Sequence, residues 1–162
     1  ADGDLDAIEQ LYLEAQRFTT PRGTPYVKPR DRAELERLLP DTLLLEHRDV
    51  IIGMLHATEV PDAEGALLIG GFVIAENHQD SQHGQLLLCE ALSRFREQGY
   101  MEAAAITASD RAKRLFDRNG GRPEPDRPWQ KRLIEDAVPR YQPEERGQVQ
   151  LFRFDLRTGN GG

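Results

Sequence analysis

The sequence predicts an α/β domain in which helices cover a mixed, mostly antiparallel central sheet. Two helical patterns come first, three short strands then follow without a helix between them, and helices and strands alternate to the end. Successive short strands pair antiparallel, whereas a strand–helix–strand order returns the chain in parallel. Because 162 residues are enough for a real core, we expect a single domain over residues 1–162.

Two helices are predicted before the first strand. Asp4 is expected to cap a helix that ends near Phe18, because the apolar residues after it recur at helical spacing. Prolines then predict an ordered loop over residues 19–29. Asp31 begins a second helix with a capping-box-like pattern, and Pro40 stops it.

Three strands are predicted next, as an antiparallel meander. Residues 42–46 and 50–60 are aliphatic runs separated by a short turn, and a second turn over residues 61–65 leads into the third strand. That strand ends in the apolar run 72–75.

Helices and strands alternate in the rest of the chain. A leucine-rich helix is expected to end at Gly99, a short strand covers residues 102–108, and Ser109 caps the next helix. Pro128 suits the first turn of a further helix, and residues 148–156 read as the closing strand.

Composition excludes several classes of function. Twenty-eight acidic and 21 basic residues give a net charge of −7, which argues against nucleic acid as a partner. No apolar run approaches the ~20 residues of a membrane span and no signal-peptide pattern opens the sequence, so we expect a cytoplasmic protein without a membrane partner.

Cysteine and histidine usage predicts no metal site. Cys89 is the single cysteine, which excludes an internal disulfide, and its place in a leucine-rich helix predicts a packed thiol. The histidines lack metal-ligand spacing, and surface or turn positions are expected for all four: His47, His56, His78 and His83.

The main functional signal lies between Phe72 and Leu87. A strand runs into a polar turn that contains Gly84, and a helix starts at once. The first N–H groups of a helix lack intrahelical partners and, with the helix dipole, favour an anion. Gly84 has no Cβ, so a ligand can approach the backbone closely. An ordinary strand-to-helix turn is the alternative interpretation.

Residues 79–88 resemble a sequence motif of the GNAT acetyltransferase superfamily. The acetyl-CoA pyrophosphate loop of that family has the pattern R/Q-x-x-G-x-G/A before a Leu-Leu helix, and this chain has Gln79-Asp80-Ser81-Gln82-His83-Gly84 before Leu87-Leu88. Gln82 stands where the first glycine usually is. The predicted order of helices and strands is also that of GNAT domains.

Within that superfamily the chain is most similar to the acetyltransferase domain of N-acetylglutamate synthases. Three further segments carry this similarity: residues 27–36, residues 50–53 and Tyr141-Gln142. The resemblance implies that acetyl-CoA is the co-substrate and that no metal is needed.

The resemblance also assigns residues to the acetyl-CoA site. Backbone groups of Phe72, Val73 and Ile74, on a strand splayed from its neighbour, would meet the pantetheine, although all three also suit a core strand. Phe116 falls where many GNAT enzymes have a general-acid tyrosine. The residues expected around the pyrophosphate are Gln79, Gln82, His83, Gly84 and Gln85.

The catalytic base stays unassigned. Many family members have a glutamate early in the strand before the loop, and this place falls at Leu68. A water chain, His56 or Tyr141 are open substitutes.

Arg30 matches the family arginine that holds a substrate carboxylate, with Lys28 beside it. The alternative is that Arg30 and Arg32 are surface residues at the start of a helix without a role in binding, although the helix dipole disfavours positive charge there.

These features predict an acetyl-CoA-dependent N-acetyltransferase that acts on the amine of a small molecule, with glutamate as the leading acceptor. One alternative is another amine or a protein N-terminus. Another is a non-catalytic acyl-CoA-binding regulatory module, which Leu68, Phe116 and Gln82 would suit. Whether the chain is a whole protein or an excised domain, and whether it forms a homodimer, are left open.

Overall fold

A computed structural model describes residues 2–15, 31–38, 42–75, 82–123, 127–141 and 143–157. These residues form one six-stranded sheet with helices on both faces. The elements are α1 (Asp2–Ala15), α2 (Arg32–Leu38), β1 (Thr42–His47), β2 (Val50–Glu59), β3 (Ala66–Ile74), α3 (His83–Glu97), β4 (Glu102–Thr107), α4 (Asp110–Arg118), β5 (Arg122–Pro123), α5 (Pro128–Ala137), η3 (Val138–Arg140), η4 (Pro143–Gln148) and β6 (Gln150–Asp155).

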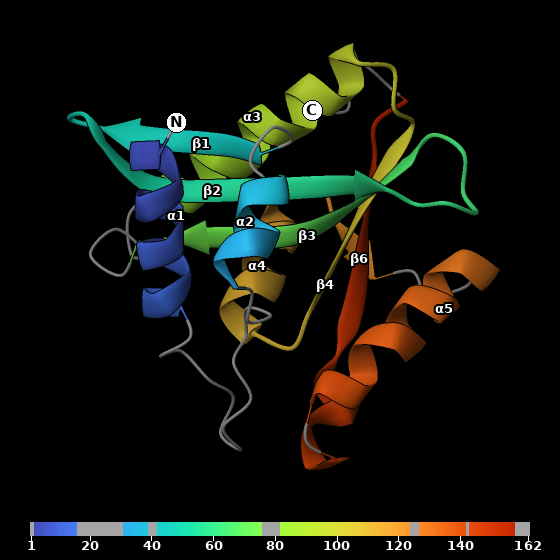
Figure 1. Cartoon of the computed structure of the whole chain (residues 1–162). Helices are drawn as coiled ribbons and strands as arrows, with labels where there is room; N and C mark the ends of the chain where they lie inside the picture. Colours follow the sequence, from blue (N-terminus) through green and yellow to red (C-terminus); the bar gives the residue numbers. More distant parts are fainter. Residues whose placement is uncertain are drawn as a thin grey trace.

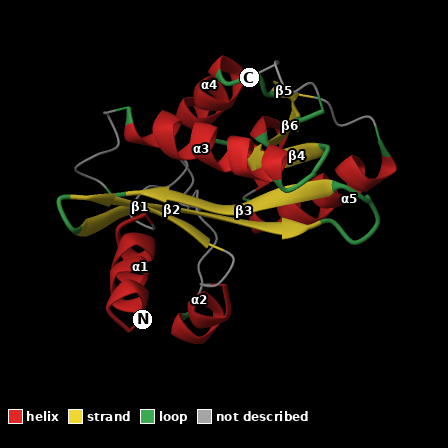
Figure 2. Ribbon diagram, turned by 90° about the horizontal axis from the view of Figure 1, so that it is seen from above, coloured by secondary structure: helices red, strands yellow, loops and turns green. Residues whose placement is uncertain are grey.

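The sheet has the strand order β1-β2-β3-β4-β6-β5. β3 and β4 run parallel, and the other neighbouring strands run antiparallel. Figure 2 shows α1 and α2 on one face of the sheet and α3 and α4 on the other. The predicted fold class, a mixed and mostly antiparallel sheet flanked by helices, is therefore confirmed.

The first two helices differ from the prediction at one end. α1 begins at Asp2, so Asp4 lies within the first turn and the predicted cap at Asp4 is wrong. An acidic residue in the first turn still suits the helix dipole. The predicted end near Phe18 lies outside the described residues. Asp31 caps α2 as predicted, because its Oδ1 accepts a hydrogen bond of 2.9 Å from the Glu34 N–H.

Local turn chemistry accounts for several element ends. Arg48 and Asp49 both have positive φ, 53° and 65°, which closes the β1–β2 hairpin with the twist that its strands require. Gly99 ends α3 with φ of 92°, and its N–H and that of Tyr100 donate to carbonyls of the last helical turn. Ser109 caps α4 as predicted.

Apolar side chains pack on both faces of the sheet. One cluster under α1 and α2 contains Leu5, Ile8, Leu11, Tyr12, Leu35, Met54 and Val73. A larger one under α3 and α4 includes Leu55, Ile69, Leu88, Ala105, Phe116, Phe152 and Phe154. A third joins α5 to the sheet through Trp129, Val60, Ala66, Ala104 and Leu151.

Two predictions about single side chains are wrong. Cys89 is exposed, and its Sγ donates to Asn119 Oδ1 at 3.0 Å, because it lies on the outer side of α3 while Leu88 faces the core. His56 is neither at the surface nor in a turn, since it lies within β2 with 1% of its surface exposed. Among the described helices, none is long and apolar enough to cross a membrane.

Candidate active site

β3 and β4 are paired along only part of their lengths. The register joins Ala66–Ile69 to Glu102–Ala105. Beyond these residues β3 continues to Ile74 and β4 to Thr107, outside the register that joins the two strands. In Figure 1 the two strands start close together and their far ends separate. This split opens at the carboxyl ends of two parallel strands, the edge where α/β sheets bind ligands.

An extra residue in β3 marks the point where the pairing stops. His56 and Ala57 are consecutive in β2, but their partners in β3 are Gly71 and Ile69, so Gly70 is a bulge. Because of this bulge, Ile69 and Phe72 both pack toward α3. A bulge at this position redirects the β3 backbone at the mouth of the split.

The three residues expected at the pantetheine all follow the bulge. Phe72 and Ile74 pack in the cluster under α3, and Val73 packs under α1 and α2. Their side chains therefore belong to the core, while their backbone runs along the split. The sequence allowed these residues to be core strand residues or to contact the pantetheine. The two interpretations are compatible, since the first concerns side chains and the second concerns backbone groups.

The amino terminus of α3 lacks a side-chain cap from its N-cap residue. Its N-cap residue Gln82 makes no side-chain capping hydrogen bond, in contrast to Ser109 at the start of α4. The N–H groups of His83, Gly84 and Gln85 thus lie in an uncapped first turn, which favours an anion. The predicted Gln79 lies outside the described residues.

The surroundings of Gly84 do not by themselves require glycine. A Cβ at this position would lie 3.6 Å from Leu115 Cδ2 and 3.9 Å from Ile74 Cγ1, which are ordinary contacts. A glycine here therefore suits close approach by a ligand better than it suits the packing of α3.

The structure brings a second histidine to this terminus. The rings of His47, at the end of β1, and His83 have centroids 5.5 Å apart and are tilted by 53°. Imidazole N–H groups are good partners for phosphate oxygens. The sequence analysis missed His47 because only the pairing of β1 with β2 places it beside α3, and no local motif signals that.

Phe116 occupies the α3 side of the sheet as part of an aromatic cluster. It is 5% exposed, and its ring centroid lies 6.5 Å from that of Phe72, 5.6 Å from Phe152 and 5.8 Å from Phe154. Leu68 packs on the opposite face, against the cluster of Trp129 and Val60.

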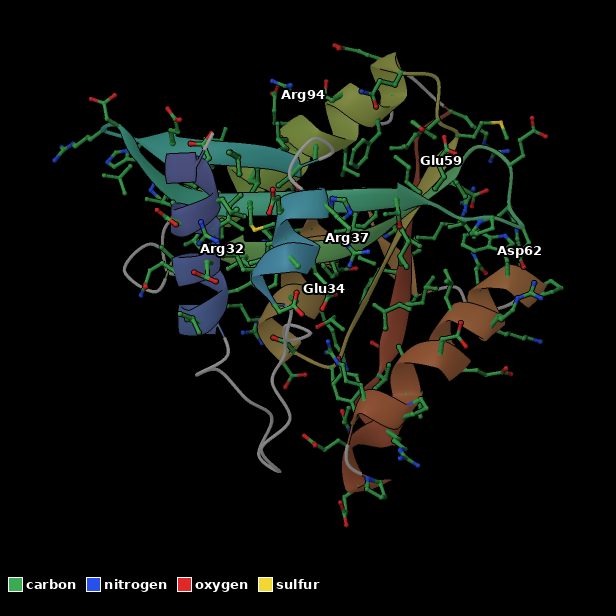
Figure 3. The ribbon with its side chains drawn as sticks, in the orientation of Figure 1. Arg32, Glu34, Arg37, Glu59, Asp62 and Arg94 are labelled. Carbon is green, nitrogen blue, oxygen red and sulfur yellow. The ribbon has the colours of Figure 1, made fainter. Side chains whose placement is uncertain are left out.

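The residues expected to hold the acceptor, Lys28 and Arg30, lie outside the described residues. Arg32 is described, and its Nη1 lies 2.8 Å from Asp6 and 3.1 Å from Glu9 of α1. The hydrogen bond that Arg32 donates to Asp6 is the main reason why the pKa of Arg32 is raised. Figure 3 shows Arg32 reaching from α2 toward α1. Arg32 therefore links the two helices whose connection carries Arg30.

A separate open groove of about 670 Å³ lies at the other end of α3. Its walls include Leu43, Leu55 and Phe95, and its rim carries Tyr100, whose hydroxyl donates to Glu59 at 2.7 Å. This groove does not reach the split. In the described part of the chain no three His, Cys, Asp or Glu side chains are arranged to hold a metal ion.

Comparisons with known proteins agree with this geometry. Residues 5–121 match the model of the acetyltransferase (GNAT) family. N-acetylglutamate synthase from Neisseria gonorrhoeae, solved with coenzyme A and N-acetyl-glutamate, is 19% identical with a TM-score of 0.73, covering 96% of this chain and 33% of that one. The chain thus spans a third of the length of that synthase.

Two shorter enzymes are similar over nearly their whole length. PaiA N-acetyltransferase from Thermoplasma acidophilum, in complex with coenzyme A, is 12% identical with a TM-score of 0.63, covering 94% of this chain and 93% of that one. The ribosomal-protein-S18-alanine N-acetyltransferase of Escherichia coli is 11% identical with a TM-score of 0.68, covering 96% and 90%.

At such identities the likeness to solved structures shows the fold. A search among curated proteins found no match. Since the family model covers most of the chain, and since the split sheet and the uncapped helix suit acetyl-CoA, this protein belongs to the GNAT family of acetyltransferases.

Proposed function

We propose that this protein transfers the acetyl group of acetyl-CoA to the amine of a small molecule, with an acidic amino acid such as glutamate as the leading acceptor. The observation that carries the proposal is the uncapped amino terminus of α3 at the open end of the β3–β4 split. A pyrophosphate fits the amino terminus of α3, and a thin pantetheine arm fits the split between β3 and β4.

Acetyl transfer to an amine needs three things from the protein. The thioester must lie beside the amine, its carbonyl must be polarised, and the proton of the ammonium must leave. Binding at the α3 terminus anchors the pyrophosphate, so the arm reaches back along Phe72 to the bulge at Gly70. The acetyl carbonyl then lies among the redirected backbone groups of β3.

The choice of an acidic acceptor rests on Arg30 and Lys28. A guanidinium binds a carboxylate with two parallel hydrogen bonds, which favours substrates that carry one. The ion pairs of Arg32 with Asp6 and Glu9 fix the start of α2 directly after Arg30. The solved synthase that contains N-acetyl-glutamate is similar over 96% of this chain, which supports the same acceptor class.

A protein amino terminus is the second candidate acceptor. It is favoured by the likeness to the ribosomal-protein-S18-alanine N-acetyltransferase, whose whole length is comparable with that of this chain. A non-catalytic acyl-CoA-binding module is the third, and it differs from both in predicting binding without turnover.

One assay separates the three candidates. Release of free CoA is measured with acetyl-CoA and a panel of acidic, neutral and basic amino acids, polyamines and short peptides, while calorimetry measures acetyl-CoA binding. We expect turnover with glutamate or aspartate above the rest. Preferential turnover of peptides supports the second candidate. Binding without turnover of any acceptor supports the third and contradicts the proposed transfer.

A further inference from the structure

The groove at the carboxyl end of α3 lies where two neighbouring strands differ in length. β1 begins at Thr42, opposite His56, whereas β2 continues to Glu59. Among the described strands, this last part of β2 is paired with β3 alone. α3 therefore packs over a part of the sheet that is one strand narrower, and an open groove of about 670 Å³ is left between helix and strands.

The floor and the inner wall of the groove are apolar. Their side chains come from three strands and from α3: Leu43, Leu55, Ala57, Leu67 and Phe95. Small-molecule sites have volumes of about 300–1,000 Å³ and combine an apolar lining with a few polar groups. The groove therefore has the size and the lining for a small ligand with an apolar body.

The strand side of the groove carries a negative charge. Glu59 lines the groove, and its Oε1 accepts a hydrogen bond of 2.7 Å from the Tyr100 hydroxyl. Tyr100 is brought there because Gly99 ends α3 with a positive φ, after which the Tyr100 N–H donates to the Phe95 carbonyl. A carboxylate has about four acceptor sites, so Glu59 can also accept hydrogen bonds from an ammonium group.

The helix side of the groove carries a positive charge. Arg94 lines the groove from α3, and its side chain is 56% exposed. Its Nε donates to Glu90 Oε1 at 3.1 Å, in an exposed pair one helical turn apart that contributes little to stability. A guanidinium has further N–H donors on its two Nη atoms, which suit a ligand carboxylate.

The two opposite charges define the ligand. Figure 3 shows Arg94 on α3 and Glu59 at the end of β2. We propose that this groove binds a small zwitterion whose apolar body separates its two charges, such as a dipeptide of apolar residues with free termini. The carboxylate binds Arg94, the ammonium binds Glu59 and the apolar side chains lie on the strand floor. Because the two charges of the groove come from different walls, this ligand fits better than an α-amino acid, whose charged groups share one carbon atom.

The distribution of apolar surface favours a small ligand over a protein partner. Four large apolar side chains of the described structure are exposed, and none of them lines the groove: Leu13, Val50, Leu86 and Met101. The apolar surface of the groove is therefore confined to its concave floor and does not continue into a raised patch. Since the groove is separate from the split, this inference goes beyond the proposed acetyl transfer and does not depend on it.

Calorimetry with three probes tests both charged contacts. The probes are leucyl-phenylalanine, its amide, which lacks the carboxylate, and its N-acetyl form, which lacks the ammonium. We expect Arg94→Gln to weaken binding of leucyl-phenylalanine by about 5- to 10-fold and to leave binding of the amide unchanged. Glu59→Gln should weaken binding of leucyl-phenylalanine by a similar factor and leave binding of the N-acetyl form unchanged.

Matched controls separate these contacts from a general effect of charge. Arg118→Gln on α4 and Glu64→Gln in the turn after β2 change the net charge equally at exposed residues that do not line the groove. Each should change the Kd by less than about twofold. Glu90→Gln should tighten binding by about twofold, because Glu90 then no longer competes with the ligand carboxylate for Arg94.

Several outcomes overturn the proposal. One is the absence of binding at about 10 mM leucyl-phenylalanine, a concentration that detects even millimolar affinity. Another is an equal loss for all three probes, which indicates a structural effect of the substitution. Binding that neither Arg94→Gln nor Glu59→Gln changes places the dipeptide elsewhere, and tighter binding of free leucine contradicts the separated charges. None of these outcomes bears on acetyl transfer, which the release of CoA measures independently.

Discussion

The Arg153 Nε on β6 lies 2.7 Å from Glu102 Oε1 at the start of β4. Both side chains are shielded, at 11% and 8% exposure, and Arg127 contacts the same carboxylate from the more exposed side at 3.0 Å. Removal of a buried ionic partner leaves the other charge uncompensated. The pair therefore ties the two strands together on the face that carries α5.

We expect Glu102→Ala to lower the free energy of unfolding by about 3 kcal/mol, because Arg153 loses its nearest carboxylate. Urea unfolding followed by circular dichroism measures the change. Arg127→Ala is the matched control. Because Arg127 is 48% exposed, this substitution should lower the free energy of unfolding by less than about 1 kcal/mol. Equal effects of the two variants contradict a special role for the inner pair.

Gly84→Val should weaken acetyl-CoA binding by at least about 10-fold, which corresponds to 1.4 kcal/mol. The branched side chain keeps the pyrophosphate away from the N–H groups of the first turn of α3. The protein around Gly84 has room for a Cβ, so the variant should fold. Gly147→Val, where a Cβ meets nothing within 4 Å, is the control. An unchanged Kd by calorimetry in folded Gly84→Val contradicts the anion site.

His47→Ala should weaken acetyl-CoA binding a few-fold and should not alter the Tm by more than a surface substitution does. The reason is the position of His47 beside His83, the first residue of α3. Val50→Ala is the control, because Val50 lies on the same hairpin and is 59% exposed. If the two variants bind acetyl-CoA equally well, His47 takes no part in the site.

Arg30→Ala should lower kcat/KM for the acidic acceptor by about 10- to 150-fold, as loss of a charged hydrogen bond costs about 1.5–3 kcal/mol. The KM for acetyl-CoA should barely change. Arg30→Lys should recover only part of the loss, because an ammonium cannot form two parallel hydrogen bonds. Arg37→Ala, in the last turn of α2, is the control. A loss shared equally by both substrates argues against a carboxylate contact.

The stability of the protein should depend on Asp155 at low pH. Hydrogen bonds from the Arg157 side chain and backbone hold the pKa of this carboxyl well below its ordinary 3.8. Because the pKa of Asp155 is lower in the folded protein than in the unfolded chain, its ionised form stabilises the protein above about pH 4. This contribution is lost as the pH falls further.

The measurement is the difference in unfolding free energy between the unmodified protein and Asp155→Asn. We expect a small, constant difference from pH 5 to 7 that shrinks as the pH falls below about 4. If the difference in unfolding free energy instead grows as the pH falls, the pH dependence has the opposite sign and contradicts the Asp155–Arg157 interaction.

Local signals in the sequence determined most of the elements. Apolar periodicity, the cap at Asp31, the glycine after α3 and the cap at Ser109 act over a few residues, and the structure has each where it was predicted. The turn of η3, the turn of η4 and the two-residue β5 were missed, because elements that short have no periodicity to detect.

The tertiary structure alone decided which distant residues meet. Nothing near Gly70 in the sequence says that β3 carries a bulge, since a bulge exists only relative to the partner strand β2. The same register places His56 inside the sheet beside Gly71. The pairing of β1 with β2 places His47 beside His83. Strand pairing joins residues that are far apart in the sequence through hydrogen bonds. The sequence therefore determined the elements and predicted a turn that suits an anion, while pairing determined the split and the side chains around it.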